Sequence, residues 1–255
     1  IDYYEGMIGH KRGGSSQLSL TFSSGGPFAN GIKALLRHVP GNDETAAELW
    51  ATDGSNQLCR LAGAATWTEP TPKDAIAGAP HDVNGVSFNG KLFLFHDSAA
   101  NRNQVWDGTA LRRQGLAAPT GTPTIGLGVG AVTSTRKYRA TVIVKSGSDI
   151  LRRSEPNETP TAAPALAAQQ ATVTLVGAPS ESETHWELWG ADIGDNYATY
   201  RYINEAAIGA TIVDNNTALT GTAMAAIGTY LTPPSARYGV ADDARVVMAG
   251  NYRPS

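Results

Sequence analysis

The side chains of this chain that could support catalysis or hold a metal ion are a few histidines and carboxylates. His81 and Asp82 precede a predicted hairpin, and His96 and Asp97 follow it. A histidine beside a carboxylate can act as an oriented base or a metal ligand, but each pair could also end a strand and bind the turn backbone. The histidines match no metal-site spacing on one element: His10, His38, His81, His96 and His185. We expect no catalytic and no metal-binding residue among them.

Two acidic loops could offer hard oxygen atoms to a calcium ion. The residues are Asp192, Asp195 and Asn196 in the first loop and Asp214, Asn215 and Asn216 in the second. Aspartate and asparagine also form turns without any ion, because their side chains bond the nearby backbone. We therefore expect turns in both places and no bound cofactor.

A glycine-rich segment, Gly126–Ala131, formally matches a dinucleotide-binding fingerprint. That fingerprint requires glycines that follow a strand and open a helix, whose N-terminus holds the pyrophosphate. The following residues, Val132–Lys145, alternate like a strand, so a loop or strand edge is predicted. The chain also has no phosphate loop and no Gly-x-Ser-x-Gly motif before a helix. We expect that the protein is not an enzyme.

The aromatic, sulfur and basic side chains have simpler expected roles. The tryptophans could stack on sugars, but most lie in or beside predicted strands, which favours core packing. They are Trp50, Trp67, Trp106, Trp186 and Trp189. Cys59 is predicted to be a buried apolar residue, and a single cysteine excludes an internal disulfide framework. The basic doublets are expected in solvent or at subunit contacts: Arg112-Arg113, Arg136-Lys137 and Arg152-Arg153.

The composition is that of a folded, turn-rich protein. Of 255 residues, 41% are apolar and 17% charged, and 28 glycines and 14 prolines favour short strands joined by turns. The formal net charge of -3 disfavours stable duplex binding, and the apolar runs are too interrupted for a membrane span. The sequence starts at Ile1 without a signal segment, so nothing indicates secretion. We expect it to be the ordered or cleaved part of a longer polypeptide.

The first part of the chain, residues 1–116, is predicted to form short strands. Asn89-Gly90 joins Val83–Phe88 to Lys91–His96, and this pair favours the type I′ turn of a hairpin. Other predicted strands are Gln17–Phe22, Ile32–Val39, Glu48–Thr52, Gln57–Leu61 and Gln104–Trp106. Short strands about every eight to twelve residues are typical of propeller blades or of a sandwich.

A second region, residues 117–218, follows a proline-containing linker. Lys137–Lys145 alternates, with Tyr138, Ala140, Val142 and Val144 on one face. Further strands are predicted at Ala171–Val176, Thr184–Gly190, Tyr197–Ile203 and Ala210–Val213. This number of strands predicts an Ig-like sandwich.

The last part, residues 219–255, contains Ala244–Asn251, which repeats the strand and turn pattern of the first region. The sandwich is thus predicted to be inserted in a β-propeller-like domain that residues 1–116 begin and residues 219–255 rejoin. The predicted fold class is all-β.

Several short motifs resemble the tail nozzle proteins, also called tail hub or stabilisation proteins, of short-tailed, podovirus-type bacteriophages. Leu92–Phe95 followed by Val105–Gly108 resembles a blade of their propeller. Glu187–Gly190 with Tyr200–Ile203 resembles the fibronectin-III-like module often inserted in them. Val247–Asn251 is similar to the place where such chains re-enter the propeller.

The resemblance implies a structural role in the virion, for a protein made in the host bacterial cytoplasm. Such proteins form hexameric rings of identical subunits below the portal and adaptor, beside other tail proteins. They extend the channel through which genomic DNA passes without specific binding. On this basis the two acidic loops are expected to face outward, toward neighbouring subunits or host-contacting fibres: Asp192, Asp195, Asn196, Asp214, Asn215 and Asn216.

Two other functions remain open from the sequence. A carbohydrate-binding adhesin or receptor-binding module of a tail would stack exposed tryptophan and tyrosine on sugar rings, and would bind glycans as a monomer or trimer. A β-propeller glycoside hydrolase or lyase would need two or more carboxylates facing one cleft. In that case, mutation of Asp82 or Asp97 would abolish turnover.

Overall fold

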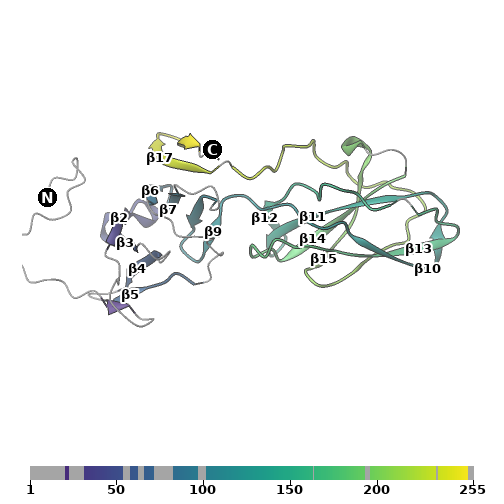
Figure 1. Ribbon diagram of the computed structural model, residues 1–255, viewed down its shortest axis with the longest axis horizontal. Helices are drawn as coiled ribbons and strands as arrows, with labels where there is room; N and C mark the ends of the chain where they lie inside the picture. Colours follow the sequence, from purple (N-terminus) through teal and green to yellow (C-terminus); the bar gives the residue numbers. More distant parts are fainter. Residues whose placement is uncertain are drawn as a thin grey trace, which may run out of the picture.

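The computed structural model describes residues 21–22, 32–53, 58–62, 66–71, 83–96, 102–162, 164–192, 196–233 and 235–251. In these ranges the chain is all-β, with several mainly antiparallel sheets, none of them closed. The helical elements of these ranges are three short 3-10 turns: η2 (Pro40–Asn42), η3 (Glu44–Ala46) and η4 (Tyr197–Thr199). No helix described here is long and apolar enough to span a membrane. Figure 1 shows an N-terminal group of strands beside an elongated central group.

The N-terminal group contains two sheets. The first has the order β1-β5-β4-β3-β2, and the second has the order β6-β7-β8-β9. The strands of the first are β1 (Thr21–Phe22), β2 (Ile32–His38), β3 (Glu48–Asp53), β4 (Leu58–Ala62) and β5 (Thr66–Thr68). Those of the second are β6 (Val83–Phe88), β7 (Lys91–His96), β8 (Gln104–Trp106) and β9 (Leu111–Arg113). The predicted β6–β7 hairpin is confirmed: Asn89 and Gly90 have φ values of 47° and 73°.

The two N-terminal sheets share one apolar core, and β2 of the first sheet contacts β6 of the second. Trp50 of β3 and Trp106 of β8 lie 5.2 Å apart between ring centroids. β2 and β6 approach closely because Gly85 has no side chain, and a Cβ there would lie 2.8 Å from Leu36 Cδ1. The predicted strands therefore pair as meanders, and tryptophan packing joins one meander to the next.

The central group also contains two sheets. The four-stranded sheet has the order β12-β11-β14-β15, and the three-stranded sheet has the order β10-β13-β16. The strands of the first are β11 (Lys137–Ser146), β12 (Asp149–Arg153), β14 (His185–Ala191) and β15 (Arg201–Ala207). Those of the second are β10 (Thr124–Val132), β13 (Gln169–Thr174) and β16 (Ile212–Asp214).

One contiguous core lies between the two central sheets. The predicted inward face of β11 is confirmed, because all four of its apolar residues are buried: Tyr138, Ala140, Val142 and Val144. They pack with Trp186 and Leu188 of β14 and with Val173 and Ile212 of the other sheet. Each sheet thus covers the apolar face of the other.

After β16 the chain returns to the N-terminal group in two steps. The returning segment, residues 219–233, first runs beside β15: Tyr202 N–H donates to the Thr222 carbonyl (2.9 Å), and Met224 N–H donates to the Tyr200 carbonyl (3.0 Å). The hairpin of β17 (Ala236–Asp242) and β18 (Arg245–Asn251) then lies against β6 and β7. In Figure 1 this hairpin, in yellow, sits over the N-terminal strands.

Some predicted elements differ from the observed ones. Tyr197–Ile203 is not one strand: the Asn196 side chain accepts the Ala198 N–H (3.0 Å), which caps η4, and β15 begins only at Arg201. The strands β12 and β17 were not expected, since neither Asp149–Arg153 nor Ala236–Asp242 alternates clearly. Residues 219–233, the first half of the last predicted region, contact β15 of the central sheet before the chain reaches the β17–β18 hairpin.

Candidate functional site

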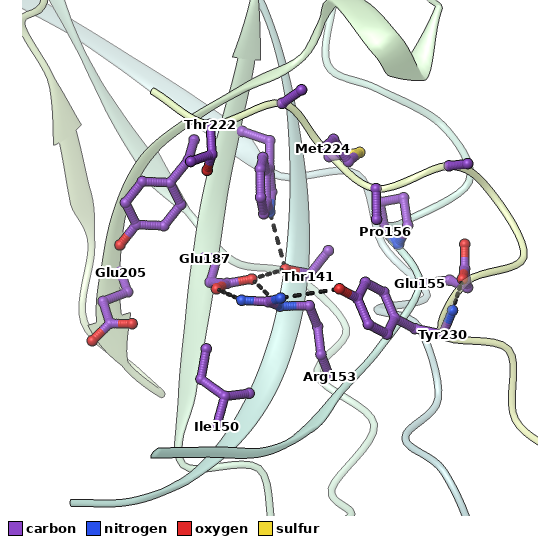
Figure 2. Close-up of a pocket in the computed structure, with 15 residues that line it drawn as sticks. Thr141, Ile150, Arg153, Glu155, Pro156, Glu187, Glu205, Thr222, Met224 and Tyr230 are labelled. Atoms are coloured by element: carbon purple, nitrogen blue, oxygen red, sulfur yellow. Dashed lines mark hydrogen bonds and ion pairs between the residues drawn. The ribbon is translucent and has the colours of Figure 1, made fainter. Parts of the chain in front are cut away.

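The four-stranded central sheet has a polar outer face on the side opposite its core. Alternation along β11 and β14 buries Ala140 and Leu188 in the core and places Thr141 and Glu187 on the other face. The returning segment covers this outer face. A cavity of about 460 Å³, the outer-face cavity, lies between the sheet and the segment (Figure 2).

An ion pair between the partly exposed Arg153 and the buried Glu187 forms the floor of the outer-face cavity. Arg153 Nε donates to Glu187 Oε2 (2.9 Å) and Arg153 Nη2 donates to Glu187 Oε1 (2.6 Å), a bidentate contact. Thr141 Oγ1 donates to Glu187 Oε2 (2.8 Å) and accepts from Trp189 Nε1 (3.0 Å). Only 2% of the Glu187 side chain is exposed. The chain of bonds therefore fixes the floor in one conformation.

One wall of the cavity comes from the returning segment. Arg153 Nη1 donates to Tyr230 Oη (3.2 Å), and the guanidinium carbon lies 5.4 Å from the centroid of that ring. Glu155 accepts the backbone N–H of Gly228 (3.1 Å) and that of Tyr230. Figure 2 shows Arg153 between Glu187 and Tyr230. Arg153 at the end of β12 and Glu155 just after it thus hold the returning segment over the cavity.

The other wall comes from β14 and β15. The rings of Trp189 and Tyr202 meet edge to face, with centroids 5.6 Å apart. Glu205 of β15 also lines the cavity and forms an ion pair with Lys145. Met224 and Ile150 add apolar surface.

The charges of the cavity are balanced by local partners. Burial lowers the pKa of Arg153, but its bonds to Glu187 outweigh that and raise the pKa above its ordinary value. Burial and the nearby carboxylates of Glu205 and Glu187 raise the pKa of Tyr202 to about 12, so its hydroxyl keeps its proton at neutral pH. The cavity therefore presents a matched ion pair and the protonated hydroxyl of Tyr202.

The two predicted acidic loops come together at a different place, around Arg136. Arg136 Nε donates to Asp192 Oδ1 (2.8 Å) and Nη1 donates to Asp214 Oδ2 (2.7 Å). Tyr138 Oη also donates to Asp214 Oδ2 (2.9 Å). Burial lowers the pKa of Arg136, but Asp214 and Asp192 outweigh that and raise the pKa. This cluster links both loops to the core.

The expectation that these loops face outward is wrong for Asp214, whose side chain is fully buried. Asn215 Oδ1 accepts the backbone N–H of Ala131 (2.7 Å), and the backbone N–H of Asn216 donates to the side-chain Oδ1 of Asp214 (3.1 Å). Asn196 caps η4 and Asp195 lies outside the described residues. Asp192 is partly exposed but is bound to Arg136. A buried carboxylate that neutralises a buried guanidinium cannot serve as a surface contact.

The histidines considered for catalysis lie beside uncharged polar side chains wherever the structure describes them. His38 Nδ1 lies 3.0 Å from Ser87 Oγ, and His96 Nε2 lies 3.2 Å from Gln104 Oε1. Burial lowers the pKa of His38, and Glu48 opposes this more weakly. His185 Nδ1 lies 3.0 Å from Thr184 Oγ1. The other candidates lie outside the described residues: His10, His81, Asp82 and Asp97. Within the described ranges no group of three His, Cys, Asp or Glu side chains is arranged to hold a metal ion.

The expectations for the glycine-rich segment, the tryptophans, Cys59 and the basic doublets can also be compared with the structure. Gly126–Ala131 lies within strand β10, so the prediction of a strand edge is confirmed. Core packing is confirmed for the tryptophans, which are at most 5% exposed, and Cys59 is buried. The expectation that the basic doublets lie in solvent or at subunit contacts is wrong for Arg136, which is fully buried.

The outer-face cavity was not predicted from the sequence, although one signal was present. Glu187 is a charged residue between two tryptophans in a strand, and such a residue requires a partner when buried. The sequence does not identify Arg153 or Tyr230 as that partner. Comparisons with protein families, with curated proteins and with solved structures gave no match to this chain.

Proposed function

We propose that this protein is a structural subunit of the tail of a short-tailed bacteriophage. It assembles with identical subunits into a nozzle-type ring below the portal and adaptor of the virion. The supporting observation is the order of the chain: it leaves the N-terminal sheets after β9, builds the two central sheets, and returns as β17–β18 against β6 and β7. A propeller-like domain interrupted by an Ig or fibronectin-III-like sandwich has this order.

The β17–β18 hairpin offers a surface for a neighbouring subunit. Several of its large apolar side chains are exposed: Tyr238, Val240, Val247 and Met248. Val240 pairs with Val247 across the hairpin, and these two are 58% and 40% exposed. Exposed apolar side chains that lie together mark contact surfaces more often than isolated ones. We place the subunit contact of the ring on this hairpin.

The charge of the chain suits a channel for DNA. A net charge of -3 gives no excess of cations that would hold phosphates by counterion release. Genomic DNA would therefore pass through the ring without specific binding.

The experiment that tests this function is the native mass of the purified protein, followed by electron-microscope class averages. A six-fold ring with an open centre is expected, alone or with its virion partners. The variant Val240→Lys should shift the mass toward the monomer while leaving the circular-dichroism spectrum unchanged, because the side chain is exposed. Val213→Lys on β16, at a similarly exposed valine outside the hairpin, is the matched control. A monodisperse monomer in the presence of those partners would contradict the proposal.

A further inference from the structure

We propose that the outer-face cavity binds an uncharged saccharide unit. This inference goes beyond the proposed ring function, because the cavity belongs to the central sheet and not to the β17–β18 hairpin. The volume of about 460 Å³ lies within the range of small-molecule sites, which is about 300–1,000 Å³. The chemistry of its lining decides which ligand class fits.

The charges of the lining favour a neutral ligand. Arg153 is neutralised by Glu187, so it offers no unmatched cation to a phosphate or carboxylate. Glu205 is paired with Lys145, and Glu155 accepts two backbone N–H groups. An anion would meet the carboxylates of the lining, and a cation would have to compete with the partners that these carboxylates already have. A ligand without charge disturbs none of these pairs.

The polar groups that remain suit hydroxyl groups of a ligand. Within the described part of the chain, no group bonds the hydroxyl of Tyr202 or that of Thr222, and both residues line the cavity. Tyr230 Oη accepts from Arg153 and keeps its own proton to donate. A sugar hydroxyl both donates and accepts, so it can bond all three groups. A purely apolar ligand would leave them unsatisfied.

The walls suit the apolar faces of a sugar ring. Tyr202 and Tyr230 come from β15 and from the returning segment, and Trp189 of β14 meets the Tyr202 ring edge to face. Aromatic rings provide a rigid apolar surface with a polar edge, which matches a ring that carries C–H faces and an equatorial rim of hydroxyls. The Glu155 contacts hold the segment in place before any ligand arrives, so binding needs no ordering of this wall.

The test is a binding measurement on the purified full chain. The probes are a panel of neutral oligosaccharides of glucose, galactose, mannose and N-acetylglucosamine, with tetramethylammonium and inorganic phosphate as charged probes. We expect saturation-transfer NMR signals, and a change in tryptophan fluorescence, for at least one neutral oligosaccharide and for neither charged probe. Binding of a charged probe alone, or of no probe to the folded protein, would overturn the proposal.

Two conservative variants locate the binding in the cavity. Tyr202→Phe keeps the ring but removes the hydroxyl, and Thr222→Ala removes the second unbonded hydroxyl. Each should weaken binding about tenfold, the effect expected for the loss of one hydrogen bond to a bound ligand. Tyr197→Phe and Thr217→Ala make the same changes at positions outside the cavity lining and outside the β17–β18 hairpin, and should leave the affinity unchanged. Equal affinity in all four variants would place any observed binding elsewhere and overturn the proposal.

The outcomes for the cavity and for the ring are separable. A ring that binds no saccharide would overturn the inference about the cavity alone. A monomer that binds a saccharide through Tyr202 would overturn the ring alone.

Discussion

The central and N-terminal regions cover their sheets in different ways. The central region has one contiguous core between two sheets. The returning segment, which directly follows this region in the sequence, covers the outer face of its four-stranded sheet. The N-terminal sheets share a smaller core and are also covered by β17, which lies beyond the whole central region in sequence. The central region therefore contains its own stabilising contacts, whereas the N-terminal region depends on contacts with β17, a strand far away in the sequence.

A buried ionic network is a feature of the central region. In the central region Arg136, Asp214 and Tyr138 satisfy one another. In the described N-terminal strands, Thr52 Oγ1 and Trp106 Nε1 are buried without a partner. A closed network specifies one packing of the sheets, since any shift leaves a charge unpaired. The regions should therefore respond differently to substitution.

The largest effect is expected at the centre of that network. Asp214→Asn removes the fully buried one of the two carboxylates that pair with Arg136, and breaking a buried ion pair costs about 3–5 kcal/mol. Because the partly exposed Asp192 stays bound to Arg136, we expect the lower end of this range, about 3 kcal/mol. Urea unfolding followed by far-ultraviolet circular dichroism should show this loss in the free energy of unfolding. Tryptophan fluorescence from Trp186 and Trp189 should report it as a change in the central region. A loss below about 1 kcal/mol would contradict the assigned role of the network.

A somewhat smaller effect is expected where β17 meets the N-terminal sheets. In Gly239→Ala the new Cβ would lie 2.0 Å from Cε2 of Phe95, a fully buried ring. Such overpacking costs about 1–3 kcal/mol, and the hairpin should separate from β7. Hydrogen exchange should show faster exchange in β6, β7 and β17 but not in β11.

The control for this substitution is Gly126→Ala in β10, where the nearest atom to a new Cβ is 3.8 Å away. It should leave exchange in β6 and β7 unchanged. Equal effects of both alanines would mean that β17 does not protect the N-terminal sheets.

The junction between the regions should show an intermediate effect that depends on pH. Burial raises the pKa of Glu181, but the Ala117 N–H and the guanidinium groups of Arg102 and Arg113 outweigh it and lower the pKa below its ordinary value. A carboxylate with a lowered folded pKa stabilises the fold above its unfolded pKa, and this stability is lost as pH falls through the folded pKa. The free energy of unfolding should therefore decrease as the pH falls below about 4.5. Glu181→Gln should remove the part of this decrease that comes from Glu181, and it should lower the free energy of unfolding at pH 7 by about 2 kcal/mol. Thermal unfolding of both proteins between pH 7 and pH 3 measures this, and parallel pH profiles would contradict it.

The smallest effect is expected at the exposed end of the β17–β18 hairpin. Asp242→Asn breaks an ion pair with Arg245. The side chain of Asp242 is 55% exposed and that of Arg245 is 75% exposed. Such pairs contribute less than about 1 kcal/mol, and salt screens them. The unfolding midpoint in urea should be nearly that of the unchanged protein, and a large shift would show that this end of the hairpin is buried in an assembly.

Local patterns in the sequence predicted much of the fold. The alternation of Tyr138, Ala140, Val142 and Val144 predicted the inward face of β11, because side chains of a strand alternate with a period of two. Asn89-Gly90 predicted the β6–β7 hairpin, because the turn itself requires left-handed backbone. The strands β12 and β17 were missed, since short strands without regular alternation are defined by their pairing partners.

The sequence by itself determined the all-β class, the most regular strands and the burial of the tryptophans, because these follow from neighbours a few residues apart. Only the tertiary structure decided which polar groups meet. Asp192 and Asp214 share Arg136, and Arg153, Glu187 and Tyr230 enclose a cavity, because strand register and the path of the returning segment bring together residues far apart in the chain. Charges carry no local pattern that identifies their partner, and a buried charge, such as that of Arg136, Asp214 or Glu187, requires one.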